Sequence, residues 1–484
     1  MRTDPFDRRR LFRTAGAAAL ASAAAALGVA SAAEAAAGVA YENPLAQQRA
    51  DPFIVRHTDG RYYFTASVPA YDRIVMRRST TVQGLATAPE VTVWSKHASG
   101  PMSHHIWAPE LHHIDGRWYL YFAAGRADDI WAIRMYALEN ASADPMSGTW
   151  TEKGRIVTPR DSFSLDATTF TDGGTRYLCW AQSDPELGSG TSLYLAAMAN
   201  PWTITGTPVR ISKPTLPWEV VGHKVNEGAA VVKRNGRVFM TFSASATDAN
   251  YAVGLLTASQ GANLLDPAAW SKHSQPVLRS SDATGQYGPG HNSFTVSEDG
   301  ASDLLVYHAR PYRDISGDPL YDPNRHTRVQ KFYWRADGTP DFGIPVASGP
   351  TPYRFAVHGA AGVYLNHYDF RLKANASPAM LADSQFRIVA GLTGSGTVSL
   401  ESANYPGYFL RHKNYQVWVE RGDGSSLFRS DATFHRRSGL ADASGVSFES
   451  VNASGRYVQH TGGLVDLLSP TTDAARAAAT FHLE

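Results

Sequence analysis

Three carboxylates, an indole and an imidazole stand at one recurring position of the sequence, where they could carry out acid–base chemistry. They are Asp51, Trp107, Asp166, Glu227 and His291, between 56 and 64 residues apart. Each opens a predicted β-strand, which a Gly-containing turn joins to an aromatic-rich return strand. An arginine follows the first four opening residues by ten positions, and Ala301 replaces it in the fifth copy.

Five all-strand units of about 60 residues predict an all-β fold, a five-bladed β-propeller. A single blade cannot bury both of its faces, so the units close into a ring against their neighbours. The first strand of each blade lines the central channel, and equivalent positions therefore converge. Repetition alone thus predicts that Asp51, Asp166 and Glu227 meet, with Trp107 and His291 beside them.

This set of side chains suits glycoside hydrolysis. One carboxyl group protonates the leaving oxygen, while an ionised one takes a proton from water or attacks the sugar. A third acid nearby raises the pKa of the proton donor by like-charge repulsion. Trp107 offers an apolar face to a sugar ring, and His291 could hold a water, a cation or a hydroxyl group.

Each acid taken singly also has a purely structural explanation. Asp51 precedes a proline, a common start of a turn, and the same Asp-Pro-Phe triplet begins at Asp4 near the N-terminus. Glu227 precedes Gly228 and could end an exposed strand. The shared register of three acids is what favours a functional site.

Composition and the N-terminal segment narrow the class of protein. The 484 residues carry a net charge of +1 and 18% charged residues, which predicts neither a nucleic-acid nor a membrane partner. Cys179 is the single cysteine, so no intramolecular disulfide can form. Residues 1–37 contain consecutive arginines before an Ala-rich apolar run, typical of a twin-arginine export signal. A secreted, extracellular bacterial protein is expected.

The propeller is predicted to span residues 41–338, followed by a Pro- and Gly-rich linker at 339–354 and a second domain at 355–484. The second domain repeats Gly-x-Tyr/Phe-Leu/Val-x-His three times, which fits a β-trefoil. A hydrophobic core has no use for repeated polar residues, so these predict sugar binding: His367, Asp383, His412, Asp431 and His460. The third copy has Ala478 in place of the aspartate, so its pocket is expected either to be weaker or to use Asp466 or Asp473 instead.

Four short blocks resemble the signatures of glycoside hydrolase family 43: ADPF from residue 50, WAPE from 107, SLDA from 164 and NEG from 226. The resemblance implies a five-bladed propeller and an inverting mechanism. It implies Asp51 as general base, Glu227 as general acid and Asp166 as the residue that tunes and orients the acid. It also implies that His291 helps to hold a cation or a water, and that Arg328 contacts sugar hydroxyls.

The second domain is similar to the arabinose-binding trefoil of the arabinofuranosidase B type, carbohydrate-binding module family 42. Together the two resemblances imply an exo-acting 1,5-α-L-arabinofuranosidase that releases L-arabinose. Arabinan, arabinoxylan and arabino-oligosaccharides from plant cell walls are its expected partners, and the chain is expected to be a monomer. The chemistry is expected to need no cofactor, with a structural calcium or sodium ion expected at His291, held directly or through water.

Other activities fit the same residues. An arabinoxylan side-chain arabinofuranosidase, a β-xylosidase and an endo-arabinanase are alternatives within the family. A retaining fructan hydrolase also has three acids on a five-bladed propeller, but its usual blocks are missing here: Glu227 is followed by Gly228, and Asp166 is preceded by Leu165. A non-catalytic sugar-binding protein is an alternative of another class, although a lectin has no need for three mutually repelling carboxylates.

Overall fold

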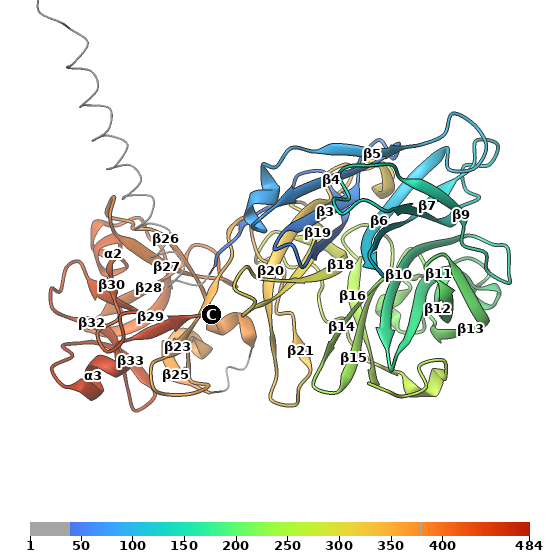
Figure 1. Cartoon of the computed structure of the whole chain (residues 1–484). Coiled ribbons are helices and arrows are strands. Elements are labelled where there is room, and N and C mark those ends of the chain that lie inside the picture. The colour runs from blue at the N-terminus through green and yellow to red at the C-terminus, as the bar shows by residue number, and fades with distance from the viewer. Residues whose placement is uncertain (1–38, 377–379) are drawn as a thin grey trace, which may run out of the picture.

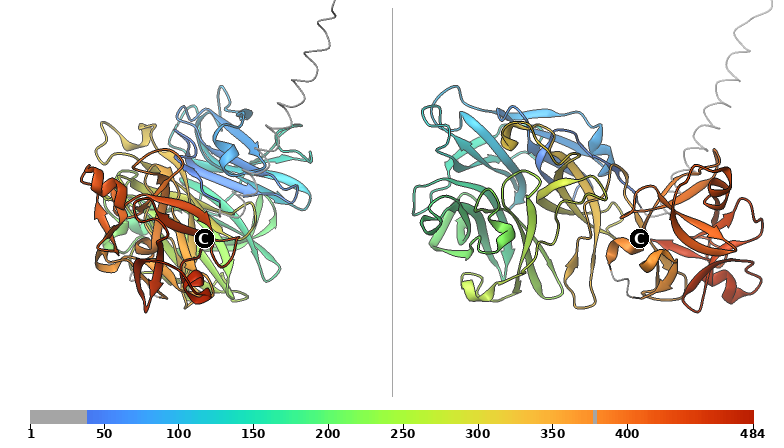
Figure 2. Two further views of the ribbon diagram at one scale, coloured as in Figure 1. Left: turned by 90° about the vertical axis from the view of Figure 1, so that its left-hand side faces the viewer. Right: turned by 180° about the vertical axis from the view of Figure 1, so that it is seen from behind.

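The computed structural model describes residues 39–376 and 380–484, and the predicted export signal lies outside this part of the chain. Two all-β domains lie side by side (Figures 1 and 2). The larger one passes from blue to gold in Figure 1 and the smaller one is orange to red. Within the described residues, the helices are too short or too polar to cross a membrane.

The larger domain is a five-bladed propeller, and each blade is an antiparallel sheet of four strands in sequence order. The strands are β2 (Ala50–Arg56), β3 (Tyr62–Ser67), β4 (Arg73–Ser79) and β5 (Val91–Ser95) in the first blade; β6 (His104–Ile114), β7 (Arg117–Gly125), β8 (Arg134–Asn140) and β9 (Thr151–Arg155) in the second; β10 (Ser164–Asp172), β11 (Thr175–Ser183), β12 (Thr191–Asn200) and β13 (Thr203–Ser212) in the third; β14 (Asn226–Arg234), β15 (Arg237–Ala244), β16 (Ala252–Ser259) and β17 (Ser271–Lys272) in the fourth; and β18 (Tyr287–Val296), β19 (Asp303–Arg310), β20 (His326–Trp334) and β21 (Pro340–Asp341) in the fifth.

Aromatic and aliphatic side chains between neighbouring blades form the cores of the ring. Tyr63 of the first blade packs with Trp118 of the second, their ring centroids 5.2 Å apart. Tyr121 of the second blade and Trp180 of the third share another buried cluster. Cys179 is fully buried in the next cluster, as expected for a small apolar side chain. This packing explains the aromatic-rich return strands, since each blade covers one face of the next.

The first and fifth blades close the ring. β18 contacts β2, and Ser293 Oγ donates a hydrogen bond of 2.8 Å to the carbonyl oxygen of Pro52. The N-terminal strand β1 (Glu42–Asn43) pairs with β22 (Gly349–Pro350). Asn43 Nδ2 also donates to the Val329 carbonyl oxygen at 2.7 Å. Residues at the two ends of the propeller sequence therefore hold each other in place.

Every innermost strand carries a β-bulge near its start, where the pairing register shifts. One residue in each bulge has a left-handed backbone: Asp51 (φ 52°), Ala108 (φ 46°), Asp166 (φ 56°), Gly228 (φ 56°) and His291 (φ 42°). In the second and fourth blades this residue follows Trp107 and Glu227 by one position. The alignment of the repeats by their arginines is therefore one residue out of register in these two blades. Arg117 is the first residue of its return strand, whereas Arg176 is the second residue of its own.

Short 3-10 helices occur in the connections, four of the first five with proline at their first turn. They are η1 (Gln83–Ala86), η2 (Pro185–Leu187), η3 (Pro217–Glu219), η4 (Pro267–Ala269) and η5 (Pro319–Tyr321) in the propeller, and η6 (Tyr368–Phe370) and η7 (Leu381–Ser384) in the second domain. In η2, η4 and η5 an aspartate side chain caps the first turn. Pro319 and Leu320 of η5 reach the rim of the central cavity described below.

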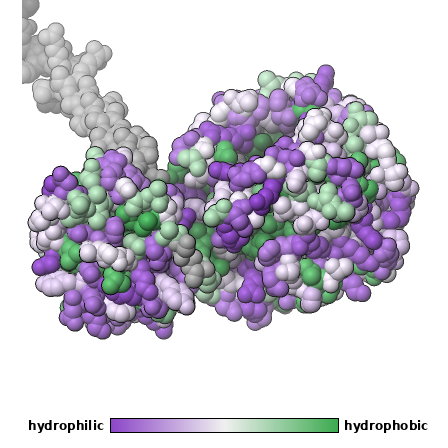
Figure 3. Space-filling view, turned by 90° about the horizontal axis from the view of Figure 1, so that it is seen from below, coloured by the Kyte–Doolittle hydropathy of each residue, from purple (hydrophilic) through white to green (hydrophobic). Residues whose placement is uncertain are grey.

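The C-terminal domain is one closed sheet with two short α-helices. Its elements are β23 (Tyr353–Val357), β24 (Tyr364–Asn366), β25 (Lys373–Asn375), β26 (Gln385–Ala390), β27 (Val398–Ser402), β28 (Tyr408–Lys413), β29 (Gln416–Arg421), α2 (Ser426–Asp431), β30 (Phe434–Ser438), β31 (Val446–Ser450), β32 (Tyr457–Thr461), β33 (Leu464–Leu468), α3 (Asp473–Ala478) and β34 (Phe481–Leu483). The repeated residues Phe386, Phe434 and Phe481 are fully buried in its core. The space-filling view shows mostly hydrophilic residues over both domains (Figure 3).

Residues 339–354, predicted to be a stiff linker between the domains, form short strands and pack closely against their neighbours. They contribute β21 to the fifth blade and β22 to the pair with β1. Phe342 is 2% exposed. Arg387 of the C-terminal domain donates hydrogen bonds to the carbonyl oxygens of Ala347 at 2.7 Å and Ser348 at 3.1 Å. A composition rich in proline and glycine predicts a linker, and it gives no sign of the burial and the hydrogen bonds that the folded chain provides.

Candidate active site

The five bulges surround one cavity of about 340 Å³. Asp51, Trp107, Asp166, Glu227 and His291 all line it, as predicted from the repeat. Its remaining wall is largely apolar and includes Trp131, Phe163, Leu165, Pro319 and Leu320. The volume is at the lower end of small-molecule sites, and the apolar wall with a few convergent polar groups is typical of them.

Hydrogen bonds from one blade to the next hold four of the bulges. The backbone N–H of the left-handed residue donates to a side chain of the preceding blade in four places: Ala108 to Ser67 Oγ (2.8 Å), Gly228 to Asp166 Oδ2 (3.0 Å), His291 to Ser243 Oγ (2.7 Å) and Asp51 to His308 Nδ1 (3.1 Å). Left-handed backbone is costly for residues other than glycine, and these bonds offset part of that cost. They also fix the directions of the acids.

Asp51 is held in its ionised form. Ser67 Oγ donates to its Oδ2 at 2.6 Å, and Arg325 Nη1 and His291 Nδ1 each lie 3.4 Å from its Oδ1. Burial alone would raise the pKa of this carboxyl group, but Arg325 and His291 outweigh it and hold the pKa well below its usual range. A buried, ionised carboxylate can accept a proton from water.

Glu227, by contrast, is held in its protonated form. Burial, and then the negative charge of Asp166, raise its pKa to about 8. Tyr251 OH donates a hydrogen bond of 2.8 Å to Glu227 Oε1, which opposes the rise. Glu227 is therefore mostly protonated at neutral pH and can donate a proton to a leaving oxygen.

The pKa of Asp166 lies between those of Asp51 and Glu227. Burial raises its pKa to about 6, with a contribution from Asp51 that His291 opposes. Its Oδ2 accepts the N–H of Gly228, the residue directly after Glu227. Asp166 thus both orients the backbone that carries Glu227 and raises the pKa of that side chain.

Trp107 and His291 complete the set. The Trp107 ring stacks on His105 with centroids 4.5 Å apart and meets Tyr71 edge-on at 5.7 Å, so its orientation is fixed. Burial would lower the pKa of His291, but Asp166 and Asp51 raise it above its usual value. The raised pKa favours the imidazolium form of a ring whose Nδ1 lies 3.8 Å from Asp166 and 3.4 Å from Asp51.

The comparisons with known proteins agree with this site. Residues 41–340 match the family "Glycosyl hydrolases family 43" and residues 353–483 match the "Alpha-L-arabinofuranosidase B (ABFB) domain". The chain belongs to glycosyl hydrolase family 43. It is therefore a glycoside hydrolase, and the alternative of a non-catalytic sugar-binding protein is wrong.

Several proteins similar to this family 43 hydrolase are named as arabinofuranosidases. It is 63% identical to an "Extracellular exo-alpha-(1->5)-L-arabinofuranosidase" of Streptomyces avermitilis, over 81% of this chain and 82% of that protein. It is 54% identical to "Alpha-L-arabinofuranosidase 43" of Humicola insolens, over 80% and 82%. A crystal structure of an α-L-arabinofuranosidase from Lactobacillus brevis is 55% identical, with a TM-score of 0.62 over 64% of this chain and 98% of that one.

The prediction that Arg328 contacts sugar hydroxyls in this hydrolase is wrong. Arg328 is 0% exposed, its Nη2 donates to the Val346 carbonyl oxygen at 3.1 Å, and it does not line the cavity. Its place at the cavity is taken by Arg325, which precedes β20. Arg325 Nη2 donates to Tyr71 OH at 2.7 Å. The two arginines are three residues apart, and only the path of the strand decides which one reaches the cavity.

Sequence reasoning missed four residues that support the acids: Ser67, Tyr251, His308 and Arg325. Ser67, Ser243 and His308 each pair across the hairpin with the residue before the bulge. Polar residues at this repeated place near the end of a return strand were a usable signal. Tyr251 and Arg325 stand in non-repeating connections, where no pattern marked them.

Two of the three predicted sugar pockets in the C-terminal domain contain the same polar network. His367 Nε2 lies 3.1 Å from Asn404 Oδ1, and Asn404 Nδ2 donates to Asp383 Oδ1 at 2.7 Å. The second repeat matches it: His412 Nε2 to Asn452 Oδ1 at 2.8 Å and Asn452 Nδ2 to Asp431 Oδ1 at 2.7 Å. The asparagines were not predicted.

The third repeat lacks this network. Strand pairing places Val357 where the other repeats have Ser402 and Ser450. Gly359 then replaces the asparagine, and Ala478 replaces the aspartate. His460 is therefore without the polar partners that fix the other two histidines.

Replacing Tyr251 by phenylalanine should shift the pH dependence of hydrolysis. The Tyr251 hydroxyl stabilises the ionised form of Glu227, so its loss raises the pKa of Glu227 further. The alkaline limb of the kcat/KM profile should move to higher pH. Tyr63→Phe is a matched control, because it removes a similar bond to Asp59, at the turn between β2 and β3, and neither residue lines the cavity. A shift of the limb to lower pH would contradict the assignment of Glu227 as the acid.

Proposed function

We propose that this protein is an inverting exo-1,5-α-L-arabinofuranosidase. The observation that carries the proposal is the pair of opposed protonation states in one cavity: Asp51 with a strongly lowered pKa and Glu227 with a pKa of about 8. An inverting glycosidase needs one ionised and one protonated carboxyl group at the same time. The names of the relatives supply the sugar and the linkage.

In the proposed reaction, Asp51 removes a proton from a water that attacks the anomeric carbon of the terminal arabinofuranose. Glu227 gives its proton to the leaving glycosidic oxygen as that bond breaks. Asp166 keeps Glu227 oriented and protonated. Trp107 packs against the sugar ring. The positive charge of Arg325 and His291 keeps Asp51 ionised until it takes the proton.

The decisive experiment is product analysis on linear 1,5-arabinan and on arabinoxylan. The proposal predicts L-arabinose as the first product from linear arabinan, released with inversion of the anomeric configuration. Oligosaccharides of several lengths would indicate an endo-arabinanase, and arabinose from arabinoxylan alone would indicate a side-chain arabinofuranosidase. Faster cleavage of a xyloside than an arabinoside would identify a β-xylosidase.

The C-terminal domain is proposed to bind arabinofuranose units of the polymer through its first two repeats, in a β-trefoil arrangement. His367→Ala combined with His412→Ala should weaken retention on insoluble arabinan roughly tenfold, since each variant position loses a hydrogen bond that contributes about 0.5–1.5 kcal/mol. Cleavage of a short arabinoside should not change. His460→Ala is the matched control and should bind like the wild type. Equal loss in that control would contradict the division into two working pockets and one inactive one.

We also propose that this protein is secreted. The relatives from Streptomyces are named extracellular, and residues 1–37 have the composition of a twin-arginine signal. Plant cell-wall arabinan, arabinoxylan and their oligosaccharides are the proposed substrates of a bacterial, monomeric enzyme. A calcium or sodium ion near His291, held directly or through water, also stays a proposal. Direct binding would have to displace the ring proton that Asp166 and Asp51 favour.

A further inference from the structure

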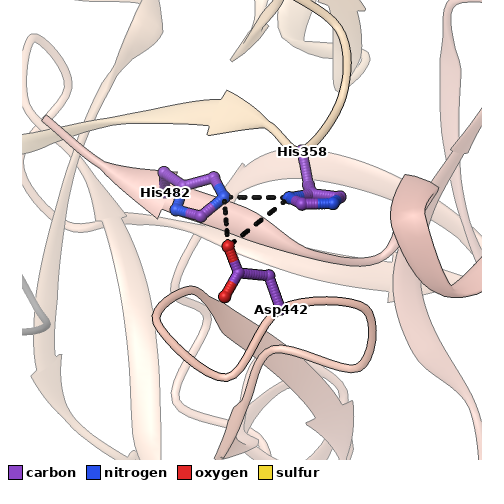
Figure 4. A group of neighbouring side chains, drawn as sticks. All are labelled: His358, Asp442 and His482. Atoms are coloured by element: carbon purple, nitrogen blue, oxygen red, sulfur yellow. Dashed lines mark hydrogen bonds and ion pairs between the residues drawn. The ribbon is translucent and has the colours of Figure 1, made fainter.

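Two histidines and an aspartate meet in the C-terminal domain, away from the cavity and from the sugar networks. His358 Nδ1 and His482 Nε2 are 3.0 Å apart. Asp442 Oδ2 lies 3.9 Å from the first nitrogen and 3.6 Å from the second, so that the three side chains point at one another (Figure 4). Among residues 39–376 and 380–484, this is the one group of three such ligands close enough to share a metal ion.

The backbone holds all three side chains in place. His482 lies in β34 opposite Ala356 of β23, and the N–H of His358 donates to the Thr480 carbonyl oxygen at 3.0 Å. Asp442 lies in the loop between β30 and β31, which a 2.9 Å bond from the Gly439 N–H to the Gly445 carbonyl oxygen closes.

One oxygen of Asp442 is occupied within its own loop. Its Oδ1 accepts hydrogen bonds from the backbone N–H of Ser444 at 2.9 Å and from Ser444 Oγ at 2.8 Å. This fixes the carboxylate and leaves Oδ2 directed at the two rings. The loop therefore presents one carboxylate oxygen in a set orientation, as a metal ligand requires.

The repeated fold does not require these residues. Strand register makes His435 of β30 the equivalent of His482, because each follows a core phenylalanine that pairs with the next repeat. Val451 is then the equivalent of His358. Gly394 is the equivalent of Asp442, because each lies four residues before a valine that pairs with a core phenylalanine, Val398 and Val446. Valine and glycine have no ligand atoms in their side chains, so the second copy of this place cannot bind a metal.

We propose that His358, Asp442 and His482 bind one divalent transition-metal ion, with Zn²⁺ as the best fit. Two imidazoles and one carboxylate are ligands that zinc accepts, whereas Ca²⁺ and Mg²⁺ prefer oxygen. In a tetrahedron with metal–ligand bonds of about 2.0–2.2 Å, ligand atoms lie roughly 3.3–3.6 Å apart. The separations of 3.0, 3.6 and 3.9 Å bracket that distance. The side chains are 31%, 38% and 36% exposed, which leaves room for water as a fourth ligand.

The ion would join the beginning of the domain to its end. His358 follows the first strand, His482 lies in the last one, and Asp442 belongs to a loop of the middle repeat. A ligand that binds only the folded domain stabilises it in proportion to the logarithm of its concentration over Kd. The proposed role is therefore structural, and hydrolysis of a short arabinoside should not depend on the metal.

The test uses the full mature chain after dialysis against a chelator. Competition with a chromogenic zinc chelator should give about one bound Zn²⁺ per chain. A hundredfold excess over Kd should raise the unfolding temperature of the C-terminal domain by roughly 5–10 °C. Ca²⁺ and Mg²⁺ should leave it unchanged. His482→Gln and Asp442→Asn should each weaken binding at least about tenfold, because even the loss of a residue that only orients a ligand costs about 10–100-fold.

His435→Gln is the matched control, because it removes the equivalent histidine where the cluster is absent. It should bind zinc like the wild type. Arabinoside hydrolysis and the unfolding transition without metal show that each variant is folded. If the wild type binds no zinc, the two rings share only an N–H···N hydrogen bond and the proposal fails. It also fails if His482→Gln and Asp442→Asn, both folded, bind zinc as tightly as the wild type.

Discussion

Glu227→Gln should lose roughly 10²–10⁴-fold in kcat/KM on arabinan oligosaccharides and far less on an aryl arabinoside. Natural glycosides leave as poor alkoxide groups and need a proton from the enzyme, whereas an activated phenol leaves with little help. Glutamine keeps the size of Glu227 and can still accept the hydrogen bond from Tyr251, so the change removes little besides the acidic proton. Steady-state kinetics on the two substrates measure the difference.

The comparison needs a control outside the cavity. Glu152→Gln alters a surface carboxylate that contacts Trp94 and His97, and both substrates should be cleaved at the wild-type rate. Glu227→Gln should also lose the alkaline limb that the acid's pKa of about 8 imposes on the aryl substrate. Equal losses on both substrates would show that Glu227 acts in some way other than protonating the leaving group.

Asp51→Asn should fail on both substrates, by roughly 10²–10⁴-fold. Water must be activated whatever the leaving group is, so a good leaving group cannot rescue this variant. An amide has no negative charge with which to take the proton. The substitution also removes the buried counter-charge beside Arg325 and one of the two beside His291, so the pKa of His291 should fall. Single-turnover rates with an aryl arabinoside provide the measurement.

Folding must be separated from chemistry in this variant. Asp282→Asn is a suitable control, since it removes a surface carboxylate paired with Arg313 and should leave both rates unchanged. Thermal unfolding of Asp51→Asn should show an intact propeller, because four blade-to-blade hydrogen bonds at the bulges use backbone N–H groups and other acceptors. Substantial turnover by a folded Asp51→Asn would exclude Asp51 as the base.

The sequence predicted which acids line the cavity, but it did not predict the backbone geometry that directs them there. The three acids were found because five repeats placed them at similar positions, and all three line the cavity. The inference tolerated an error of one residue in the second and fourth blades, since Trp107 and Glu227 precede the bulge while Asp51, Asp166 and His291 form it. The local twist of a bulge turns neighbouring side chains toward the same channel.

Residues outside the repeat were beyond this reasoning. Tyr251 and Arg325 come from connections of irregular length, and their contacts depend on where a loop returns to the ring. Arg328 was chosen in place of Arg325 because a motif says nothing about which side of a strand faces the cavity. The packing of residues 339–354 was missed for the same reason, as burial is a property of the neighbours that the folded chain supplies.

The amino-acid sequence by itself determined the two all-β domains, the repeat count and the residues that could carry acid–base chemistry, because periodic patterns and residue types are local properties. Only the tertiary structure decided the protonation states. Asp51 and Glu227 are both carboxylic acids, and nothing in their own sequence neighbourhood separates them. Burial raises the pKa of both, but Arg325 and His291 outweigh it at Asp51, whereas the negative charge of Asp166 adds to it at Glu227. Electrostatic energies depend on distances through space, and those distances exist only once the ring has closed.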